Sequence, residues 1–374
     1  MKTLAVTGLE NMAGRLVSRS DCRRVLRAAP AVLLALALAL AAGARTSSTA
    51  AASGVPPFAR VIDQPGTMLS HARLARSAVS WSGGPTTAAT GETVTVYVSA
   101  SLSPELGTPQ TWADFLAGLV HGPEISALTA YIATFAEMQE MCGDYALGCY
   151  WGDRMVSIGE TMFGITAAEV VRHEYGHHIA FHRLNPPWQA IAWGPKRWAS
   201  AENVCRRAED GSAYPGDEGE RYSLNPGEAW AETYRLMDER RTGVTGSGWN
   251  IIDSSFYPDE VAFQAAEHDV LEPWMSPQTT VARNRFAQQG KRVWTIPLST
   301  PLDGILEVTV TLPKNGLHEA VLVDGERKTV LQQGLWASRT VKRITATICG
   351  ERSLFLRITH KGAFGRVVVA TSSP

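Results

Sequence analysis

The strongest restriction on the fold of this chain comes from residues 166–182, which read TAAEVVRHEYGHHIAFH. Thr166 followed three residues later by Glu169 is a capping box, which predicts that a helix begins directly after Thr166. His173 and His177 are four residues apart, so their imidazoles lie about 40° apart on the helix surface and converge on one point. Apolar residues on both sides of the pair predict that this helix is buried.

The string HEYGH within this helix is an HExxH motif, which supplies two of the ligands that Zn²⁺ needs. Glu174 lies about 100° around the helix from His173 and therefore flanks the ion, where it can take a proton from a metal-bound water and pass it to a leaving amine. Burial of two imidazoles and a carboxylate costs free energy unless a metal is bound there. This cost argues against a chance match of the motif on a surface helix. His178 and His182 fall about 140° and 180° from His173. We interpret both as packing or hydrogen-bonding residues.

A hydrolytic zinc site has three protein ligands and leaves the fourth position for water. The longer pattern HExxHxxGxxH is excluded, because Ala180 and Arg183 stand where it requires Gly and His. A second helix is predicted at residues 225–237, NPGEAWAETYRLM, where an Asn-Pro start marks the N-terminus. In this helix Glu228 and Glu232 lie four residues apart on one face.

An HExxH motif followed about 50 residues later by a helical ExxxE resembles the gluzincin metallopeptidases. The string EAWAETYRLM is similar to the ExxAExxRLM helix of the anthrax lethal factor-like branch, and the resemblance covers residues 166–237. It implies that one Zn²⁺ per chain is held by His173, His177 and Glu228. It also implies that Glu232 hydrogen-bonds to His173 and orients it.

A second interpretation of the acidic helix stays open. Asn225 and Glu228 also have capping-box spacing, so Glu228 could only cap its helix while Glu232 binds the metal. The motif resemblance favours Glu228 as the ligand.

Hydrolysis also needs a donor that faces the developing oxyanion, and in related peptidases a Tyr or His supplies it. Tyr222, six residues before Glu228, is the candidate catalytic residue for this role, with Tyr214 and Tyr234 as rivals. From the same resemblance, the strand near residues 155–158 is the expected edge on which an extended peptide lies.

The N-terminal segment predicts export. Residues 31–42 read AVLLALALALAA and follow three arginines, which is typical of a secretory signal peptide, here residues 1–44. The apolar run is shorter than the roughly 20 residues that span a bilayer. Residues 45–57 consist mostly of Ser, Thr, Ala, Gly and Pro and predict a linker. We therefore expect a secreted protein with no stable membrane span after the signal is removed.

Five cysteines are present, and the predicted signal peptide contains Cys22. The four that remain suit an oxidising compartment and allow three connectivities. Cys142 and Cys149 flank a short loop and are the favoured pair, which leaves Cys205 to pair with Cys349.

The fold class predicted for the mature chain is α+β. Residues 58–285 are expected to form a zincin-like catalytic domain, a small mixed sheet plus active-site helices. The local patterns that support this domain are strands at 93–99 and 154–158 and helices near 111–120 and 124–141.

The last part of the chain, residues 286–374, predicts a small all-β sandwich whose partner is unknown. Leu306, Val308 and Val310 alternate with polar residues, a period-2 pattern. Gly and Asp turn signals separate further strand-like runs. These predicted runs are 306–312, 320–323, 343–347, 354–359 and 366–370.

The formal net charge is -1, which excludes a general electrostatic attraction to nucleic acid. The function predicted from the motifs is a secreted zinc endopeptidase that acts on a protein or peptide, with Glu174 as base and then acid. Two alternatives remain: a binding or adhesion protein with a non-catalytic zinc site, and a zinc hydrolase of cell-wall peptides.

Overall fold

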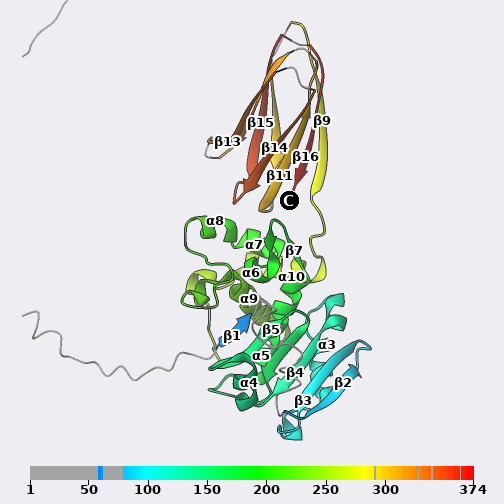
Figure 1. The fold of residues 1–374 in the computed structure, drawn as a ribbon, viewed down its shortest axis with the longest axis vertical. Helices are drawn as coiled ribbons and strands as arrows, with labels where there is room; N and C mark the ends of the chain where they lie inside the picture. Colours follow the sequence, from blue (N-terminus) through cyan, green and yellow to red (C-terminus); the bar gives the residue numbers. More distant parts are fainter. Residues whose placement is uncertain are drawn as a thin grey trace, which may run out of the picture. The chain divides into compact units, whose positions relative to one another are not determined.

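The computed structural model describes residues 58–61, 79–289, 292–314, 316–326, 328–337, 340–362 and 364–374. The predicted signal peptide (1–44) and linker (45–57) lie outside the described residues. The described chain is mixed α+β. A six-stranded sheet packed with helices is followed by two four-stranded sheets at the C-terminal end (Figure 1).

The first sheet is mixed. Its strands, in spatial order, are β1 (Phe58–Val61), β5 (Ala146–Trp151), β6 (Arg154–Ile158), β4 (Thr129–Ala133), β3 (Thr93–Ser99) and β2 (Trp81–Thr87). The pairs β5–β6 and β3–β2 are antiparallel, and the other pairs are parallel. The strands predicted at 93–99 and 154–158 are confirmed as β3 and β6.

The helix predicted at 124–141 is wrong in its first half. A 3₁₀ turn, η4 (Pro123–Ala127), is followed by strand β4, and only then by helix α4 (Phe135–Cys142). Thr134 begins α4 with a capping box to Glu137, a start signal inside the predicted helix. Strand β4 forms because it pairs with β3 on one side and β6 on the other, and this tertiary pairing overrides the local helical pattern. The other predicted helix, 111–120, is α3 (Pro109–Ala117).

Helices α5 (Ala167–Phe181) and α9 (Pro226–Thr242) pack closely against each other. A Cβ added to Gly176 on α5 would lie 2.8 Å from the Cα of Ala231 on α9, so only glycine permits this approach. The indole Nε1 of Trp230 donates to the carbonyl oxygen of Gly176 at 2.7 Å. These contacts fix the two helices at short range. α5 also packs on β5 and β6.

The remaining elements of this region are short, except for the 12-residue helix α10. They are η3 (Pro104–Leu106), β7 (Leu184–Asn185), β8 (Trp188–Gln189), α6 (Ala190–Trp193), α7 (Lys196–Ala201), α8 (Val204–Glu209), η5 (Tyr222–Leu224), η6 (Ser254–Phe256) and α10 (Glu260–Leu271).

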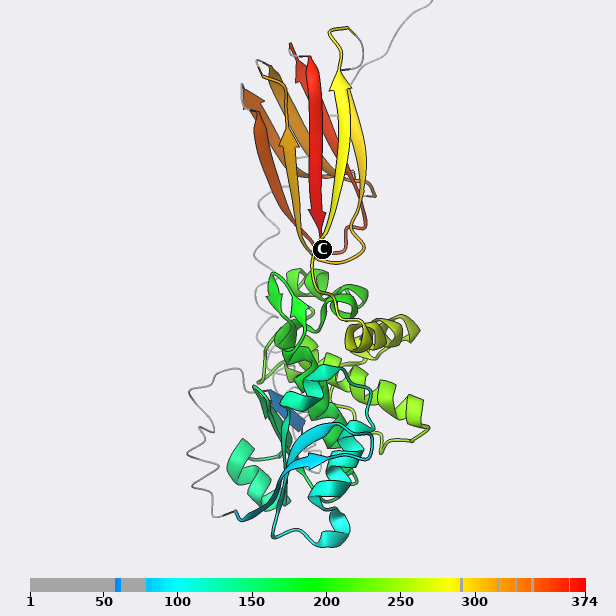
Figure 2. The same ribbon diagram turned by 90° about the vertical axis from the view of Figure 1, so that its right-hand side faces the viewer.

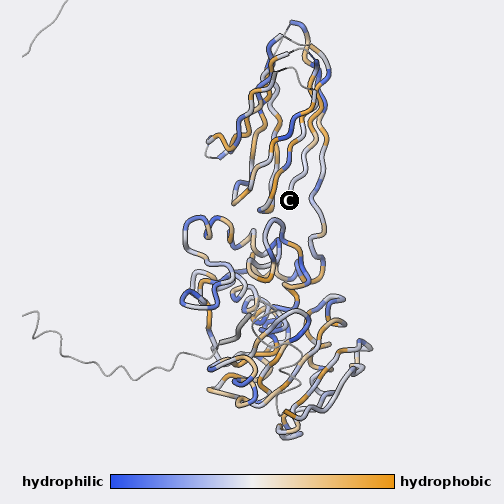
Figure 3. The backbone as a smooth tube through the Cα atoms, viewed as in Figure 1, coloured by the Kyte–Doolittle hydropathy of each residue, from blue (hydrophilic) through white to orange (hydrophobic). Residues whose placement is uncertain are grey.

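The C-terminal strands form two antiparallel, sandwich-like sheets (Figure 2). One sheet has the order β10 (Val293–Ser299), β15 (Ser353–Lys361), β12 (Leu317–Asp324) and β13 (Val330–Ala337). The other has the order β14 (Val341–Ile348), β11 (Gly304–Thr311), β16 (Gly365–Ser373) and β9 (Gln278–Phe286). Apolar residues from both sheets share one core, and hydrophobic and hydrophilic positions alternate along the strands (Figure 3). The five predicted strand runs correspond to β11, β12, β14, β15 and β16, and only the first extends beyond its strand, by one residue.

Three strands of these sheets, β9, β10 and β13, were not predicted. β9 is largely exposed and therefore lacks an alternating apolar pattern. It pairs with β16 along its length, so its residues belong to the C-terminal sheets although most of them precede the predicted boundary at 285–286.

The described residues contain two disulfides, Cys142–Cys149 and Cys205–Cys349, and both were the favoured pairs. The second joins α8 to the end of β14 across a sequence separation of 144 residues. Disulfides of this kind suit an extracellular protein. Among the described residues, no helix has the length and apolar character needed to cross a membrane.

Candidate metal centre

Helix α5 places the HExxH residues inside the protein. The Thr166 hydroxyl accepts the amide of Glu169, and the Glu169 carboxylate accepts the amide of Thr166 at 2.9 Å, as the predicted capping box requires. His173, Glu174 and His177 all have 0% relative exposure. Local capping therefore begins the helix, and packing on the sheet and on α9 buries its polar residues.

Helix α9 brings Glu228 to the two histidines. One carboxylate oxygen lies 3.2 Å from Nε2 of His173, and the other lies 3.5 Å from Nε2 of His177. The potential ligand atoms of these three buried residues all lie within 4.8 Å of one another. The arrangement could hold a metal ion, and it joins residues 55 positions apart in the sequence.

The alternative in which Glu228 only caps α9 does not agree with these contacts. Asn225 caps the helix by accepting the amide of Gly227 at 3.0 Å. The Glu228 carboxylate instead faces His173 and His177. Of the two acidic candidates, Glu228 is therefore the one that shares a potential coordination point with both histidines.

Glu232 lies on the other side of His173. Its carboxylate is 3.4 Å from Nδ1 of His173, the ring nitrogen that faces away from Glu228. Arg235 donates to Glu232 and, at 2.8 Å, to both carboxylate oxygens of Glu239. This buried chain of ion pairs restricts the orientation of the His173 ring. The i,i+3 spacing of Glu232 and Arg235 on a predicted helix is the sequence signal that could have identified Arg235.

Glu174 is the unusual residue of the centre. Both of its carboxylate oxygens are buried, and neither has a hydrogen-bond partner among the described residues. Burial raises the pKa of this carboxyl well above its ordinary value, and the nearby Glu228 charge adds to the effect, while His173 opposes it. A buried carboxylate without partners costs free energy, and such groups concentrate at functional sites.

Strand β5 passes directly beside Glu174. A Cβ added to Gly148 would lie 2.2 Å from Oε1 of Glu174, so the strand can approach this closely only with glycine. The sequence alone did not identify Gly148, because a glycine inside a strand is also common at bulges and tight bends.

Of the three tyrosines considered, Tyr222 reaches the centre. Its hydroxyl donates to the carboxylate of Glu228, and the ring is buried. Tyr234 instead donates to the carbonyl of Val120 at 2.7 Å, and Tyr214 donates to the carbonyl of Gly211 at 2.6 Å. Burial and the adjacent Glu228 charge raise the pKa of Tyr222 well above its ordinary value, so its hydroxyl stays protonated and can donate.

The charges of the centre support one another. Burial opposes a charge on His173, yet hydrogen bonds to Glu228 and Glu232 raise its pKa to about 9. Burial likewise opposes a charge on Glu228, while the charge of His177 and hydrogen bonds from both histidines hold its pKa at about 2. The carboxylate is therefore ionised at neutral pH, as a metal ligand must be.

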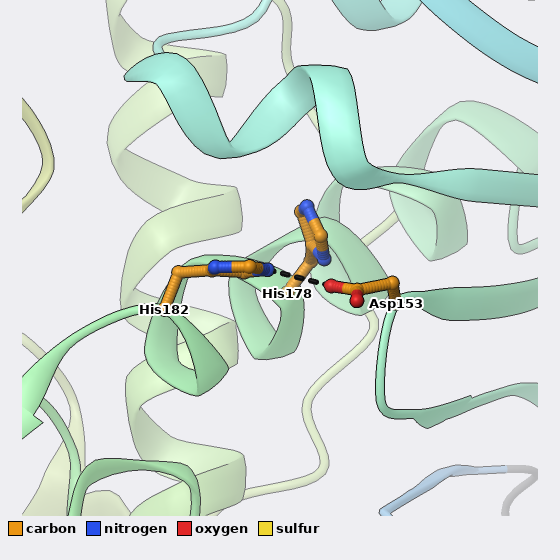
Figure 4. Close-up of side chains that lie close together, drawn as sticks. All are labelled: Asp153, His178 and His182. Carbon is orange, nitrogen blue, oxygen red and sulfur yellow. Dashed lines mark hydrogen bonds and ion pairs between the residues drawn. The ribbon is translucent and has the colours of Figure 1, made fainter.

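A second group of potential ligands consists of Asp153, His178 and His182 (Figure 4). His182 Nε2 lies 2.6 Å from the Asp153 carboxylate. Both ring nitrogens of His178 are engaged, one 3.0 Å from the Tyr150 hydroxyl and the other 2.8 Å from the carbonyl oxygen of Glu124. Burial lowers the pKa of His178 to about 4, so it is neutral. His178 and His182 thus act as hydrogen-bonding residues, as their helical positions predicted.

The third group joins Cys205 and Cys349 to Glu209. The two sulfurs form a disulfide and are not available as thiolate ligands.

A cavity of about 670 Å³ lies next to the centre and was not predicted. Tyr150 connects the two, because it lines the cavity and its ring centroid is 6.4 Å from that of the His177 ring. Most of the other lining side chains are apolar or aromatic, among them Trp151, Phe181, Leu184, Trp188 and Ile191.

The strand expected to be the peptide-binding edge, β6, is not an edge. It pairs with β5 on one side and β4 on the other, so its backbone groups are already used. Strand order cannot be read from one strand's sequence, and here β5 and then β1 lie between β6 and that side of the sheet.

No protein-family model and no curated protein matches this chain. Among solved structures, a chain of the disulfide-linked pili of Bacillus endospore appendages aligns with 28% of this chain and 96% of its own length, at 13% identity and a TM-score of 0.15. The Tobacco streak virus coat protein aligns with 28% of this chain and 90% of its own, at 8% identity and a TM-score of 0.18. A family GH115 4-O-methyl-alpha-glucuronidase aligns with 56% of this chain and 28% of its own, at 11% identity and a TM-score of 0.20. At these TM-scores the similarities support no conclusion about fold or function.

Proposed function

We propose that this chain is a secreted zinc-dependent endopeptidase of the gluzincin type, with a zincin-like catalytic region. One observation carries the proposal: His173, His177 and Glu228 converge beside Glu174, whose buried carboxylate has no hydrogen-bond partner among the described residues. A group that only stabilised the fold would gain nothing from this costly placement. A hydrolase needs a base there.

The donors fit zinc. Two imidazoles and one carboxylate are the protein ligands of one well-known class of hydrolytic zinc sites. His173, His177 and Glu228 would hold the ion, which when bound lowers the pKa of water to about 7 and polarises a carbonyl. Three ligands gather at this point among the described residues, which fits a site that keeps one position for reaction.

Side chains of the protein carry out the proton transfers, stabilise the oxyanion and orient the ligands. Glu174 takes the proton of the attacking water and passes it to the leaving amine, and its raised pKa brings it closer to the working pH of such a base. The hydroxyl of Tyr222, which donates to Glu228 in the resting structure, turns its single proton to the developing oxyanion during the reaction. Glu232, itself held by Arg235, orients His173.

Secretion is part of the proposal. It is supported by the signal-like residues 1–44 and by two disulfides, which persist in oxidising compartments.

The two alternatives differ in testable ways. A non-catalytic zinc site in a binding protein would require a fourth protein ligand, and the nearest extra carboxylate, Glu232, faces the other nitrogen of His173. A zinc hydrolase of cell-wall peptides would use the same centre and differ only in its substrate.

The deciding experiment measures metal content and cleavage of casein and of cell-wall peptides by secreted residues 45–374. We expect one zinc per chain, loss of cleavage with 1,10-phenanthroline, and recovery when zinc is added back. Protein without zinc would overturn the site assignment. Bound zinc with cleavage of cell-wall peptides alone would favour the third hypothesis, and cleavage that survives the chelator would exclude a zinc mechanism.

Gly148→Ala tests the position of Glu174. The added methyl must displace the Glu174 carboxylate, because its Cβ would lie 2.2 Å from Oε1. We expect kcat/KM to fall about 100-fold, the loss typical of a misplacement of about 1 Å, while zinc content stays unchanged. Gly118→Ala is the matched control, since its Cβ would meet only two backbone carbonyl oxygens, both at 3.3 Å, a contact that a shift of a few tenths of an ångström relieves. Equal activity of the two variants would contradict the assigned role of Glu174.

A further inference from the structure

The outer edge of β5 is occupied by a short segment from the N-terminal part of the chain. Residues 58–61 form β1, which pairs with β5 in parallel, and β1 is the last strand on that side of the sheet (Figure 1). The register places Ala59 opposite Gly148 and Val61 opposite Tyr150.

This edge belongs to the strand that passes beside Glu174 of the candidate metal centre. Gly148, the partner of Ala59, is the residue whose close approach to Glu174 excludes a Cβ. β1 also lies against both α5 and α9, the helices that supply His173 and Glu228. The backbone of residues 58–61 therefore lies between the strand that passes Glu174 and the two helices of the centre.

The same edge has the properties that an extended peptide needs. The inner edge of β5 is used by β6, so only its outer edge can accept another strand. Towards its end β5 contains Tyr150 and Trp151, which line the neighbouring cavity, so a peptide on this strand would run from Glu174 towards a largely apolar pocket. In the present structure His173, Glu174, His177 and Glu228 are all fully buried, although a hydrolase must admit its substrate to them.

We propose that residues 58–61 are a self-inhibitory segment, which lies along the outer edge of β5 where an extended polypeptide substrate would otherwise dock. The inference rests on the proposed function, because it assigns substrate and regulation to the same centre. A parallel pair of four residues is short, and parallel pairing is slightly less stable per residue than antiparallel pairing. A peptide that enters antiparallel to β5 can therefore replace it.

The test displaces β1 in the full secreted chain with Ala59→Pro/Arg60→Pro. Neighbouring residues of a strand direct their N–H groups to opposite sides, so one of the two prolines removes a donor to β5. The matched control is Ala51→Pro/Ala52→Pro, outside β1. The probe is a fluorescein-labelled peptide with the sequence of residues 57–63, PFARVID, and binding is followed by fluorescence anisotropy.

We expect the displaced variant to bind the peptide at least tenfold more tightly than the parent and the control. Its casein cleavage should rise at least tenfold, and excess unlabelled peptide should reverse the rise. Equal peptide binding by variant and parent would overturn the proposal, as would a fall in cleavage with zinc retained. If neither form cleaves any substrate, the proposed function fails, and peptide binding still decides whether residues 58–61 block a docking edge.

A variant that loses zinc has misfolded, so a second measurement uses the parent. Hydrogen exchange of the amides of residues 59–61 is compared with and without a peptidyl hydroxamate. We expect exchange at least tenfold faster with the inhibitor bound, because it takes the edge of β5. Unchanged protection with the inhibitor bound would overturn the proposal.

Discussion

Glu174→Gln is expected to abolish peptide hydrolysis while the chain keeps its zinc. Glutamine has the size of glutamate but cannot accept a proton at neutral pH, so the general base is lost. Removal of such a base typically lowers the reaction rate about 100- to 10,000-fold. We expect the fall in kcat to lie at the upper end of this range, because Glu174 serves in both proton transfers. Zinc should remain because Glu174 is not among the three clustered ligands.

The measurements for this variant are zinc content after dialysis and kcat on a peptide substrate. The matched control is Glu140→Gln, which neutralises an exposed carboxylate on α4. The substitution also removes a carboxyl group whose ionised form burial disfavours, so the variant should be at least as stable to denaturant as the parent. Normal activity of Glu174→Gln with full zinc content would contradict the proposed role of Glu174 as the general base.

Glu228→Ala is expected to yield protein without zinc, and Glu232→Ala to yield protein that still binds it. Glu228 faces Nε2 of both histidines, whereas Glu232 contacts only the other nitrogen of His173. Structural zinc sites bind their ion with a free energy of about 10–16 kcal/mol. Loss of one direct ligand removes its share of this binding free energy, roughly 3 kcal/mol or more. Loss of a residue that only orients a ligand weakens binding about 10- to 100-fold.

Competition with a zinc chelator of known affinity measures both variants. Glu239→Ala is the control, because it removes another buried carboxylate of α9 that pairs with Arg235 and does not contact the histidines. The capping interpretation of Glu228 requires the opposite order. If Glu232→Ala lost zinc and Glu228→Ala kept it, Glu232 would be the ligand and Glu228 the supporting residue.

Much of the site was predictable because its signals are local. The capping box of Thr166 and Glu169 and the i,i+4 spacing of His173 and His177 depend on helix geometry alone, and both appear in α5 as expected. The Cys142–Cys149 pair also follows from a short loop.

Other predictions failed where the decisive contacts come from distant residues. Residues 129–133 carry an apolar pattern that reads as part of a helix, and they form β4 only because β3 and β6 lie on either side of them. β9 shows no alternation, since it lies largely exposed at the end of its sheet, where pairing with β16 determines its structure. The peptide-binding edge was misassigned to β6 for the same reason: an edge is a property of the whole sheet.

The sequence by itself determined two helices with their caps, the pair of histidines with Glu174 between them, and two carboxylates on one helical face. These features repeat at spacings that a single helix imposes. Only the tertiary structure decided that Glu228 shares a point with both histidines, that Tyr222 and neither rival reaches it, and that β1 lies along β5. These contacts depend on how closely α5, α9 and β5 approach one another. That approach is governed by packing at Gly176 and Gly148, between residues far apart in the chain.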